Sequence, residues 1–302
     1  MSPILSICIP CYGRVEYVRK TLHSIFNDNN DVSFEEYEVI ISDNDPTKTI
    51  ETLMQEFQVP NLKYFNTKCE GFMNSYHVLT YASGEFLKLH NSQTILKKGS
   101  LQKMIQEIKS VRDKKPLMFY TNGLLGKLKS ISFDSFESFM YSLSYWSSWS
   151  NGFCIWKEDF EKIGKVELNK LFPHTSIFLT QYYATSYIIN DQILFDVQRI
   201  PKRGGHNKFA AFTIEYPSLI DTCYKQRHIS FKCKQHIIKN IMFTFLPSLL
   251  FNKYIARIET FESTGFKQNI KKYFPSYAYP LVWFLVITVP FKLIYRKIKT
   301  SL

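Results

Sequence analysis

The sequence has few cysteines, and none is spaced for metal binding. Six cysteines in 302 residues are too few for a disulfide framework. Cys69, Cys154, Cys223 and Cys233 show no spacing with histidines that would indicate a zinc site. No basic leader precedes the first apolar segment. These absences argue against a disulfide-rich secreted domain, and we expect the protein to work in a reducing cytoplasm.

An uninterrupted apolar run that could cross a membrane is also missing. A helix needs about 20 apolar residues to span the hydrocarbon layer. The charge-free stretch 273–291 contains three prolines, and its clean part, 281–291, is too short. Aromatic residues within this stretch and four cations after it are typical of an interfacial anchor. We therefore expect peripheral or re-entrant attachment rather than a span.

Acidic residues are nearly absent from the last quarter of the chain. Residues 1–223 carry 24 basic and 24 acidic side chains, whereas residues 224–302 carry 14 basic and two acidic ones. From Ile229 to Phe245, apolar residues recur every four positions between lysines, which predicts a basic amphipathic helix. We expect a domain of residues 1–223 and a helical extension of residues 224–302 that lies on an anionic membrane. The alternative is a helical hairpin packed on the first domain.

No zinc-finger spacing or RNA-recognition pattern occurs, so nucleic acid is not an expected partner despite the net charge of +12. The chain does contain short apolar strands that end in polar residues. The first strand ends at Pro10 and the turn Tyr12-Gly13-Arg14, and the strand 39–41 ends at Ser42-Asp43-Asn44. Ligands of open α/β sheets bind at the carboxyl ends of strands. Pro10, Tyr12, Asp43 and Asn44 should therefore converge on one nucleotide-binding crevice.

Three segments occur in the order and spacing of a known enzyme family. They are residues 5–12, 37–44 and 84–93, and together they resemble a family 2 glycosyltransferase. The resemblance covers about the first hundred residues. It implies the GT-A fold, an α/β architecture in which helices flank a Rossmann-like, mostly parallel mixed sheet.

By the same resemblance, we expect inverting transfer of a sugar from a nucleotide-sugar donor to a lipid-linked saccharide. The pathway would be assembly of a bacterial surface polysaccharide, O-antigen or capsule, on the cytoplasmic face of the inner membrane. A UDP or dTDP sugar is the donor expected from the fold. The resemblance assigns the nucleotide base to Tyr12 and Asp43. The full set of expected donor contacts is Pro10, Tyr12, Arg14, Asp43, Asn44, Asn74, Asn91, Ser92 and Gln93.

One family motif is altered. The family places Asp-x-Asp after the strand 86–89, where two carboxylates bind a divalent cation that neutralises the leaving diphosphate. This chain has Asn91-Ser92-Gln93. Amide oxygens bring no negative charge, so we expect either no required metal or a weakly bound Mg²⁺ or Mn²⁺ at Asn91 and Gln93. The competing hypothesis is a non-catalytic, membrane-bound scaffold that has lost its chemistry together with the carboxylates.

A metal-free enzyme needs other cations near the diphosphate. The segment 200–208 offers Arg203, His206 and Lys208 around a glycine pair, although it is equally readable as a solvated basic turn. His174, at the start of an expected helix from Pro173, is the candidate base, with Asp191 as the fallback; a structural histidine is the alternative. Trp149 and Asn151 are candidate acceptor contacts, against simple burial of the tryptophan in the core.

Overall fold

The computed structural model describes residues 2–200, 205–292 and 294, which divide into two compact units. The first unit comprises residues up to Arg199 and the second begins at Ile200. The expected boundary between residues 223 and 224 differs from this division because it falls inside helix α9 (Tyr216–Lys225). The chain becomes strongly basic only after residue 223, but the helix that contains Cys223 packs within the second unit.

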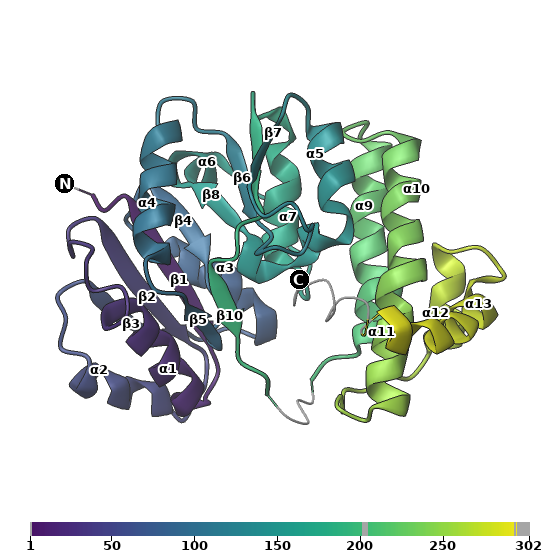
Figure 1. Cartoon of the computed structure of the whole chain (residues 1–302), viewed down its shortest axis with the longest axis horizontal. Helices are drawn as coiled ribbons and strands as arrows, with labels where there is room; N and C mark the ends of the chain where they lie inside the picture. Colours follow the sequence, from purple (N-terminus) through teal and green to yellow (C-terminus); the bar gives the residue numbers. More distant parts are fainter. Residues whose placement is uncertain (1, 201–204, 293, 295–302) are drawn as a thin grey trace. The chain divides into compact units, whose positions relative to one another are not determined.

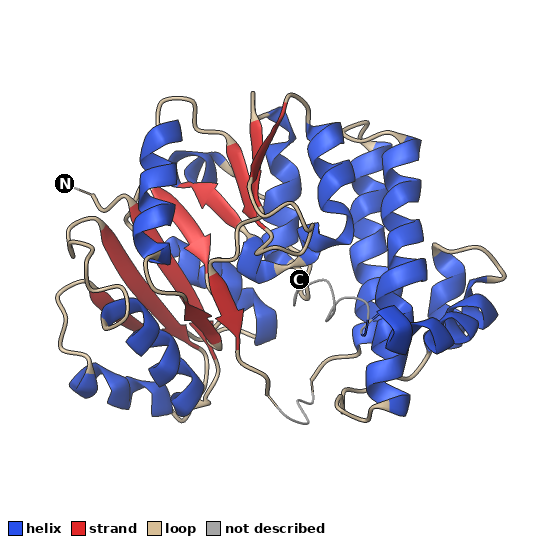
Figure 2. Ribbon diagram, viewed as in Figure 1, coloured by secondary structure: helices blue, strands red, loops and turns tan. Residues whose placement is uncertain are grey.

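The first unit is built on a five-stranded sheet in the order β3-β2-β1-β4-β8 (Figures 1 and 2). Strands β1 to β4 are parallel and β8 is antiparallel to β4. In the central register, Leu5 of β1 pairs with Tyr37 of β2 on one side and Phe86 of β4 on the other. The strands are β1 (Leu5–Cys11), β2 (Tyr37–Asp43), β3 (Leu62–Asn66), β4 (Phe86–Leu89) and β8 (Cys154–Trp156). This arrangement confirms the expected mostly parallel α/β sheet.

Two smaller sheets complete the β-structure of this unit. Strand β5 (Thr94–Leu96) pairs with β10 (Phe195–Val197), and β9 (Tyr187–Asn190) lies between β6 (Leu117–Tyr120) and β7 (Ser130–Phe133). A single bridge between Phe119 and Phe153 links β6 to the segment before β8.

Helices cover both faces of the main sheet. Alternate residues of β1, including Leu5, Ile7 and Ile9, pack into one core with the apolar faces of α1 and α4, while α3 contacts β1 and β2 from the other side. The helices of this unit are α1 (Val15–Phe26), α2 (Leu53–Glu56), α3 (Asn74–Thr80), α4 (Ser100–Val111), α5 (Phe136–Leu143), α6 (Lys157–Lys162) and α7 (Pro173–Leu179). Helix α7 begins at the proline predicted for its first turn.

The segment Ala82-Ser83-Gly84-Glu85 has a structural role at the start of β4. The backbone N–H groups of Ser83 and Gly84 donate to Oε1 of the buried Glu38, and Ser6 Oγ donates to the same oxygen. A Cβ atom on Gly84 would lie 2.5 Å from Ser6 Oγ, so only glycine fits this close approach. Burial alone would raise the pKa of Glu38, but hydrogen bonds from Lys63, Ser6 and Ser83 outweigh it and lower the pKa.

The second unit is helical throughout its regular structure in the described residues (Figure 2). Helices α9 and α10 lie side by side in Figure 1. Five-residue π-helical segments precede Pro217 in α9 and Pro247 in α11. Proline lacks the N–H of the helical ladder and its ring clashes one turn back, which the wider turns relieve. The helices are α8 (Lys208–Ala210), α9, α10 (Phe231–Asn240), α11 (Leu246–Leu250), α12 (Phe266–Asn269) and α13 (Ala278–Leu285).

The expected amphipathic helix from Ile229 to Phe245 exists, but its apolar face is covered. Ile229, Cys233, Ile237 and Ile241 are all buried within the second unit, where α10 and the turn after it contact α9, α11 and α13. The prediction that this face lies on a membrane therefore does not fit the structure, because another helix already occupies it. In the described residues, no helix combines the length and apolar character needed to cross a bilayer.

Candidate nucleotide-sugar site

The carboxyl ends of the parallel strands meet at one edge, as the sequence predicts. The Asn44 N–H donates to Cys11 O at the end of β1, and the Thr67 N–H donates to Asp43 O at the end of β2. Pro10, Tyr12, Asp43 and Asn44 are thereby brought together at the edge where an α/β sheet binds its ligand.

Tyr12 and Arg14 are the exposed residues at the end of β1 among the predicted donor contacts. The Tyr12 side chain is 63% exposed although it directly follows the buried Cys11. The following turn is left-handed at two positions, with φ +57° at Gly13 and +61° at Arg14. A Cβ atom on Gly13 would lie 2.9 Å from Asp45 Oδ2, so glycine lets the turn close against the end of β2. The turn presents an aromatic face and the exposed Arg14 at the edge of the sheet.

Asp43 and Asn74 have structural roles at this edge. The Asp43 side chain is fully buried, and its carboxylate accepts hydrogen bonds from the Asp45 N–H and the Tyr64 hydroxyl. Burial raises the pKa of Asp43. The Asn74 amide, 3% exposed, donates to the carbonyls of Cys11 and Ser42 and so ties β1 to β2. Both residues hold the crevice together, and neither side chain is open to a ligand in this conformation.

The altered motif lies at the end of β4. Asn91, Ser92 and Gln93 are half-buried; Asn91 Oδ1 accepts from Ser150 Oγ at 3.0 Å and the Asn91 N–H donates to Asn151 Oδ1 at 2.8 Å. The described residues contain no group of three His, Cys, Asp or Glu side chains that could hold a metal ion. The side-chain oxygens that could bind a metal here are neutral, and the Asn91 amide oxygen already accepts a hydrogen bond. This set does not fit a tightly bound divalent cation.

His174 lies at the start of α7, as expected, but points inward. Its Nε2 lies 2.9 Å from Ser148 O, which makes this nitrogen the donor, and its Nδ1 is buried without a hydrogen-bond partner. Burial lowers the pKa of His174 to about 4, so the ring is neutral at physiological pH. A general base must reach the proton that it abstracts. In this conformation, the structure favours the alternative of a structural histidine.

Asp191 is fully buried and saturated with hydrogen bonds. Its Oδ1 accepts from Thr121 Oγ1 and the Leu125 N–H, and its Oδ2 accepts from the Lys127 and Leu128 N–H groups. A carboxylate with four donors serves to fix the turn 121–128. The Asp191 carboxylate therefore has no free lone pair with which to accept a proton, which argues against the fallback assignment as a base.

The two candidate acceptor residues lie below the surface to different degrees. Trp149 is half-buried, with its ring centroid 5.8 Å from that of Phe195, so core packing accounts for it. Asn151 is fully buried; its Oδ1 accepts from the Asn91 N–H, while its Nδ2 has no partner. Asn151 thus positions the altered motif and does not face an acceptor in this conformation.

The basic segment is described only in part. Arg203 lies outside the described residues. Lys208 lies in the second unit, where its Nζ is 2.6 Å from Glu259 Oε2 and 5.1 Å from the centroid of the Phe261 ring. His206 is half-buried. The charge of Lys208 is therefore already balanced by a carboxylate.

Lys88 is a residue that the sequence reasoning missed. It occupies the interior of β4, is 1% exposed, and donates from Nζ to the carbonyls of Leu89 and Asn151. The rings of Tyr120 and Phe195 lie 5.2 and 5.3 Å from its Nζ. The sequence did contain a signal for it, a single lysine within the apolar run Phe86–Leu89, three residues before Asn91. Through Asn151, this buried cation is connected to the backbone of Asn91.

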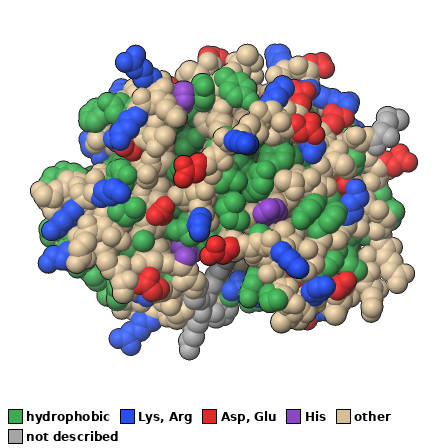
Figure 3. All heavy atoms as spheres, turned by 180° about the vertical axis from the view of Figure 1, so that it is seen from behind, with side chains coloured by type: hydrophobic (Ala, Val, Ile, Leu, Met, Phe, Trp, Pro, Cys, Tyr) green, Lys and Arg blue, Asp and Glu red, His purple; other side chains and the backbone are tan. Residues whose placement is uncertain are grey.

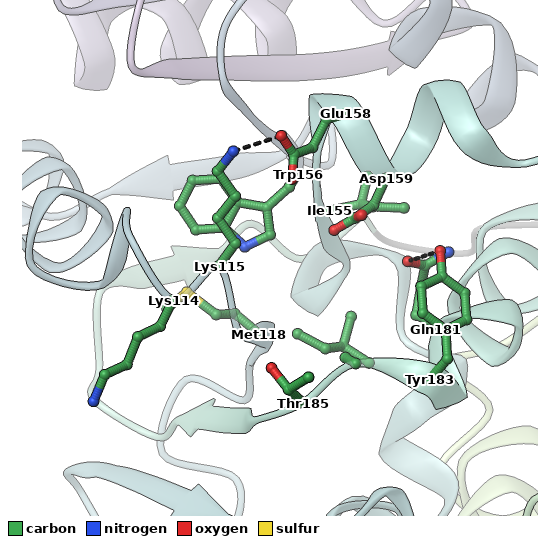
Figure 4. A pocket seen from close by; sticks show the side chains of 12 residues that line it. Lys114, Lys115, Met118, Ile155, Trp156, Glu158, Asp159, Gln181, Tyr183 and Thr185 are labelled. Atoms are coloured by element: carbon green, nitrogen blue, oxygen red, sulfur yellow. Dashed lines mark hydrogen bonds and ion pairs between the residues drawn. The ribbon is translucent and has the colours of Figure 1, made fainter.

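A surface pocket of about 200 Å³ lies elsewhere on the first unit (Figure 4). It is lined by Leu117 and Thr185, near the amino ends of β6 and β9, and by Trp156, Glu158 and Tyr183. Figure 4 shows Lys115 bonded to Glu158 across one side of it. No residue predicted for the donor or acceptor lines this pocket, so it is separate from the carboxyl-edge crevice.

Sequence and structure comparisons agree with this fold. The model of the family "Glycosyl transferase family 2" matches residues 6–114. No curated protein matches the chain. Residues 1–349 of S. aureus TarS, crystallised with UDP-GlcNAc, share 17% identity and a TM-score of 0.57, over 84% of this chain and 76% of that one.

A mannosyltransferase from Pyrobaculum calidifontis, PcManGT, solved with GDP-Man and Mn²⁺, is also similar. It shares 15% identity and a TM-score of 0.54, over 82% of this chain and 72% of that one. The family match covers the strands that form the carboxyl-edge crevice, and the structural similarity extends over most of the chain. Residues 6–114 therefore carry a family 2 glycosyltransferase domain, and the chain has the GT-A fold.

Proposed function

We propose that this chain is a glycosyltransferase that binds a nucleotide-sugar donor at the carboxyl edge of β1, β2 and β4 without needing a tightly bound metal. The observation that carries the proposal is the exposed Tyr12 on a left-handed turn at this edge, beside the fixed ends of β1 and β2. An aromatic face in this place stacks on a nucleotide base. The complexes of TarS with UDP-GlcNAc and of PcManGT with GDP-Man support a nucleotide-sugar donor.

The proposed reaction is an inverting displacement at the anomeric carbon. An acceptor hydroxyl forms the new glycosidic bond, the bond to the nucleoside diphosphate breaks, and the hydroxyl proton passes to a base. The acceptor that we propose is a lipid-linked saccharide of a bacterial surface polysaccharide, handled on the cytoplasmic face of the inner membrane. This part rests on the family alone.

The proposal includes weak metal dependence, although the neighbour PcManGT was solved with Mn²⁺. Asn91 and Gln93 stand where the family carries two carboxylates, and the described residues hold no acidic cluster that replaces them. We expect a divalent cation to contribute little to donor binding. A cation that binds weakly would do so through the amide oxygens of these two residues.

The test is calorimetry with UDP, dTDP and GDP, each titrated with Mn²⁺ and again with excess EDTA. We expect one nucleotide to bind in both conditions, and Tyr12→Ala to weaken it by about tenfold or more, since stacking on a base is worth about 1–3 kcal/mol. Tyr141→Ala, which removes another exposed tyrosine on α5, is the matched control and should bind like the wild type. Binding that disappears with EDTA would contradict metal independence.

A non-catalytic scaffold is the second candidate, favoured by the inward-facing His174 and the saturated Asp191. Donor turnover distinguishes the two. Release of nucleoside diphosphate from the donor that binds, measured with membrane extract as the source of acceptor, supports the enzyme. Binding of the nucleotide without any turnover supports the scaffold, and absence of nucleotide binding contradicts the proposed donor site.

A further inference from the structure

The C-terminal helical segment carries an exposed apolar face. Tyr277, Phe284, Ile287, Phe291 and Ile294 are each more than half exposed, with Phe284 at 66% and Phe291 at 69%. They are spaced by three, four or seven residues, which places them on one face of the segment formed by α13 and the turns after it. We call these five residues the α13 stripe.

The opposite face of the same segment is already used by the fold. Ala278, Val282, Val286 and Val289 are buried within the second unit. One face of this segment therefore packs against the rest of the second unit, and the α13 stripe is apolar surface that this packing does not bury. Scattered exposed apolar side chains are normal, but five large ones in a continuous row mark an interaction surface.

The charges around the α13 stripe are of one sign. From Ser263 to the end, the sequence contains seven basic residues and no acidic residue. Of these, Lys267, Lys271, Lys272 and Lys292 are described, and all four are exposed. Figure 3 shows Lys and Arg side chains beside hydrophobic ones at the left of the view, over the C-terminal elements.

The acidic residues that come closest before this segment in the sequence, Glu259 and Glu262, already have interaction partners. Glu259 forms an ion pair with Lys208, and Glu262 accepts hydrogen bonds from Thr264. An apolar face on a segment whose charges are all positive disfavours a second copy of this chain, because a two-fold contact would bring like charges together. It favours an anionic surface with an apolar interior.

We propose that the α13 stripe is a membrane-binding surface that inserts into the headgroup and upper acyl region of an anionic bilayer. Phe284, Ile287 and Phe291 would enter the apolar layer, while the lysines contact lipid phosphates. Tyr277 and the half-exposed Trp283 are the residue types that prefer the level of the headgroups. This binding does not depend on donor chemistry, so it stands apart from the proposed function.

The proposal is tested by sedimentation of the full-length protein with vesicles. We expect binding to vesicles of phosphatidylcholine and phosphatidylglycerol, and much weaker binding to phosphatidylcholine alone. Phe284→Ser with Ile287→Ser should weaken binding by about a hundredfold, because each buried apolar side chain contributes about 1.5–3 kcal/mol. Phe231→Ser with Ile255→Ser, at two equally exposed apolar positions of the same unit, is the matched control and should bind normally.

A second measurement does not depend on the folding of the stripe variant. Trp283 is the one tryptophan of the second unit, so brominated lipid should quench part of the wild-type fluorescence, and Trp283→Phe should remove that quenching. Equal sedimentation of stripe and control variants, or no quenching from Trp283, would overturn the proposal. Failure of the wild type to bind vesicles, with dimers that the stripe variant dissociates, would assign the surface to a second copy instead.

Discussion

Lys88 is a buried cation without a carboxylate partner among its contacts. Carbonyl oxygens of Leu89 and Asn151 and the faces of two aromatic rings surround its ammonium group. Burial lowers the pKa of Lys88 to about 8. The group is therefore costly to charge in the folded state and easy to charge in the unfolded chain.

This difference predicts a pH dependence of stability. Between about pH 8 and pH 10 the unfolded chain binds a proton at Lys88 that the folded chain does not, so stability rises with pH in this window. We expect the free energy of unfolding of the wild type to rise relative to that of Lys88→Met by up to about 3 kcal/mol. Urea unfolding across this range measures the difference. Parallel curves for the two proteins would show that Lys88 keeps its ordinary pKa.

The sequence predicted which residues lie near the site better than it predicted which of them are exposed. Tyr12 was recognised because it directly follows an apolar strand, and the structure leaves it exposed. Asn151 and His174 were chosen for their chemistry and Asn74 from the family resemblance, and all three side chains are buried. Residue type and position along the chain do not reveal whether a side chain faces inward, since that depends on contacts between distant segments.

Among the structural elements, the turn 121–128 depends most on one residue. Four donors converge on the Asp191 carboxylate, three of them backbone N–H groups of that turn. Asn122 adds a second link, since its Oδ1 accepts from the N–H groups of Leu194 and Phe195. The turn after β6 is thus fixed to the segment after β9.

Asp191→Asn should therefore destabilise the protein by about 2–4 kcal/mol, because in either orientation the new amide nitrogen replaces an acceptor oxygen and faces at least one backbone N–H donor. Urea unfolding measures the effect. Asp196→Asn, which alters an exposed ion pair with Lys97, is the control and should change stability by less than about 0.5 kcal/mol. A variant of Asp191 with normal stability but no sugar transfer would instead revive its role as a base.

Elements with strong apolar patterns were predicted well. Strands β2 and β4 and the start of α7 all lie where the sequence indicated. The amphipathic helix near Ile229 was also real, yet its partner was protein rather than lipid. A periodic apolar face shows that something covers a helix, but the sequence alone does not say what does.

At the scale of the whole chain, the crevice and its supporting residues belong to the first unit. Tyr12, Asp43, Asn74 and Asn91 all precede Arg199, as does the complete main sheet. The net positive charge lies in the last quarter of the chain. The amino-acid composition predicted a boundary where this charge begins. The structural boundary lies before it, because the helical segment 208–225 carries two basic and two acidic residues.

We expect residues 1–199 expressed alone to fold and to bind the same nucleotide as the full chain. The core of the main sheet consists only of residues from this unit, so its burial does not require the second one. Cooperative thermal unfolding and nucleotide calorimetry measure the two properties. A fragment that unfolds without cooperativity would show that the first unit is not an independent folding domain.

The pairing of β1 has a consequence for how the chain folds during synthesis. β1 lies between β2 and β4, and Leu5 meets Phe86 only after about 80 more residues have been made. At roughly 5–20 residues per second, β1 can pair with β2 several seconds before β4 is available. One edge of β1 stays open during this interval, so we expect the nascent chain to be most prone to aggregation before residue 86 emerges.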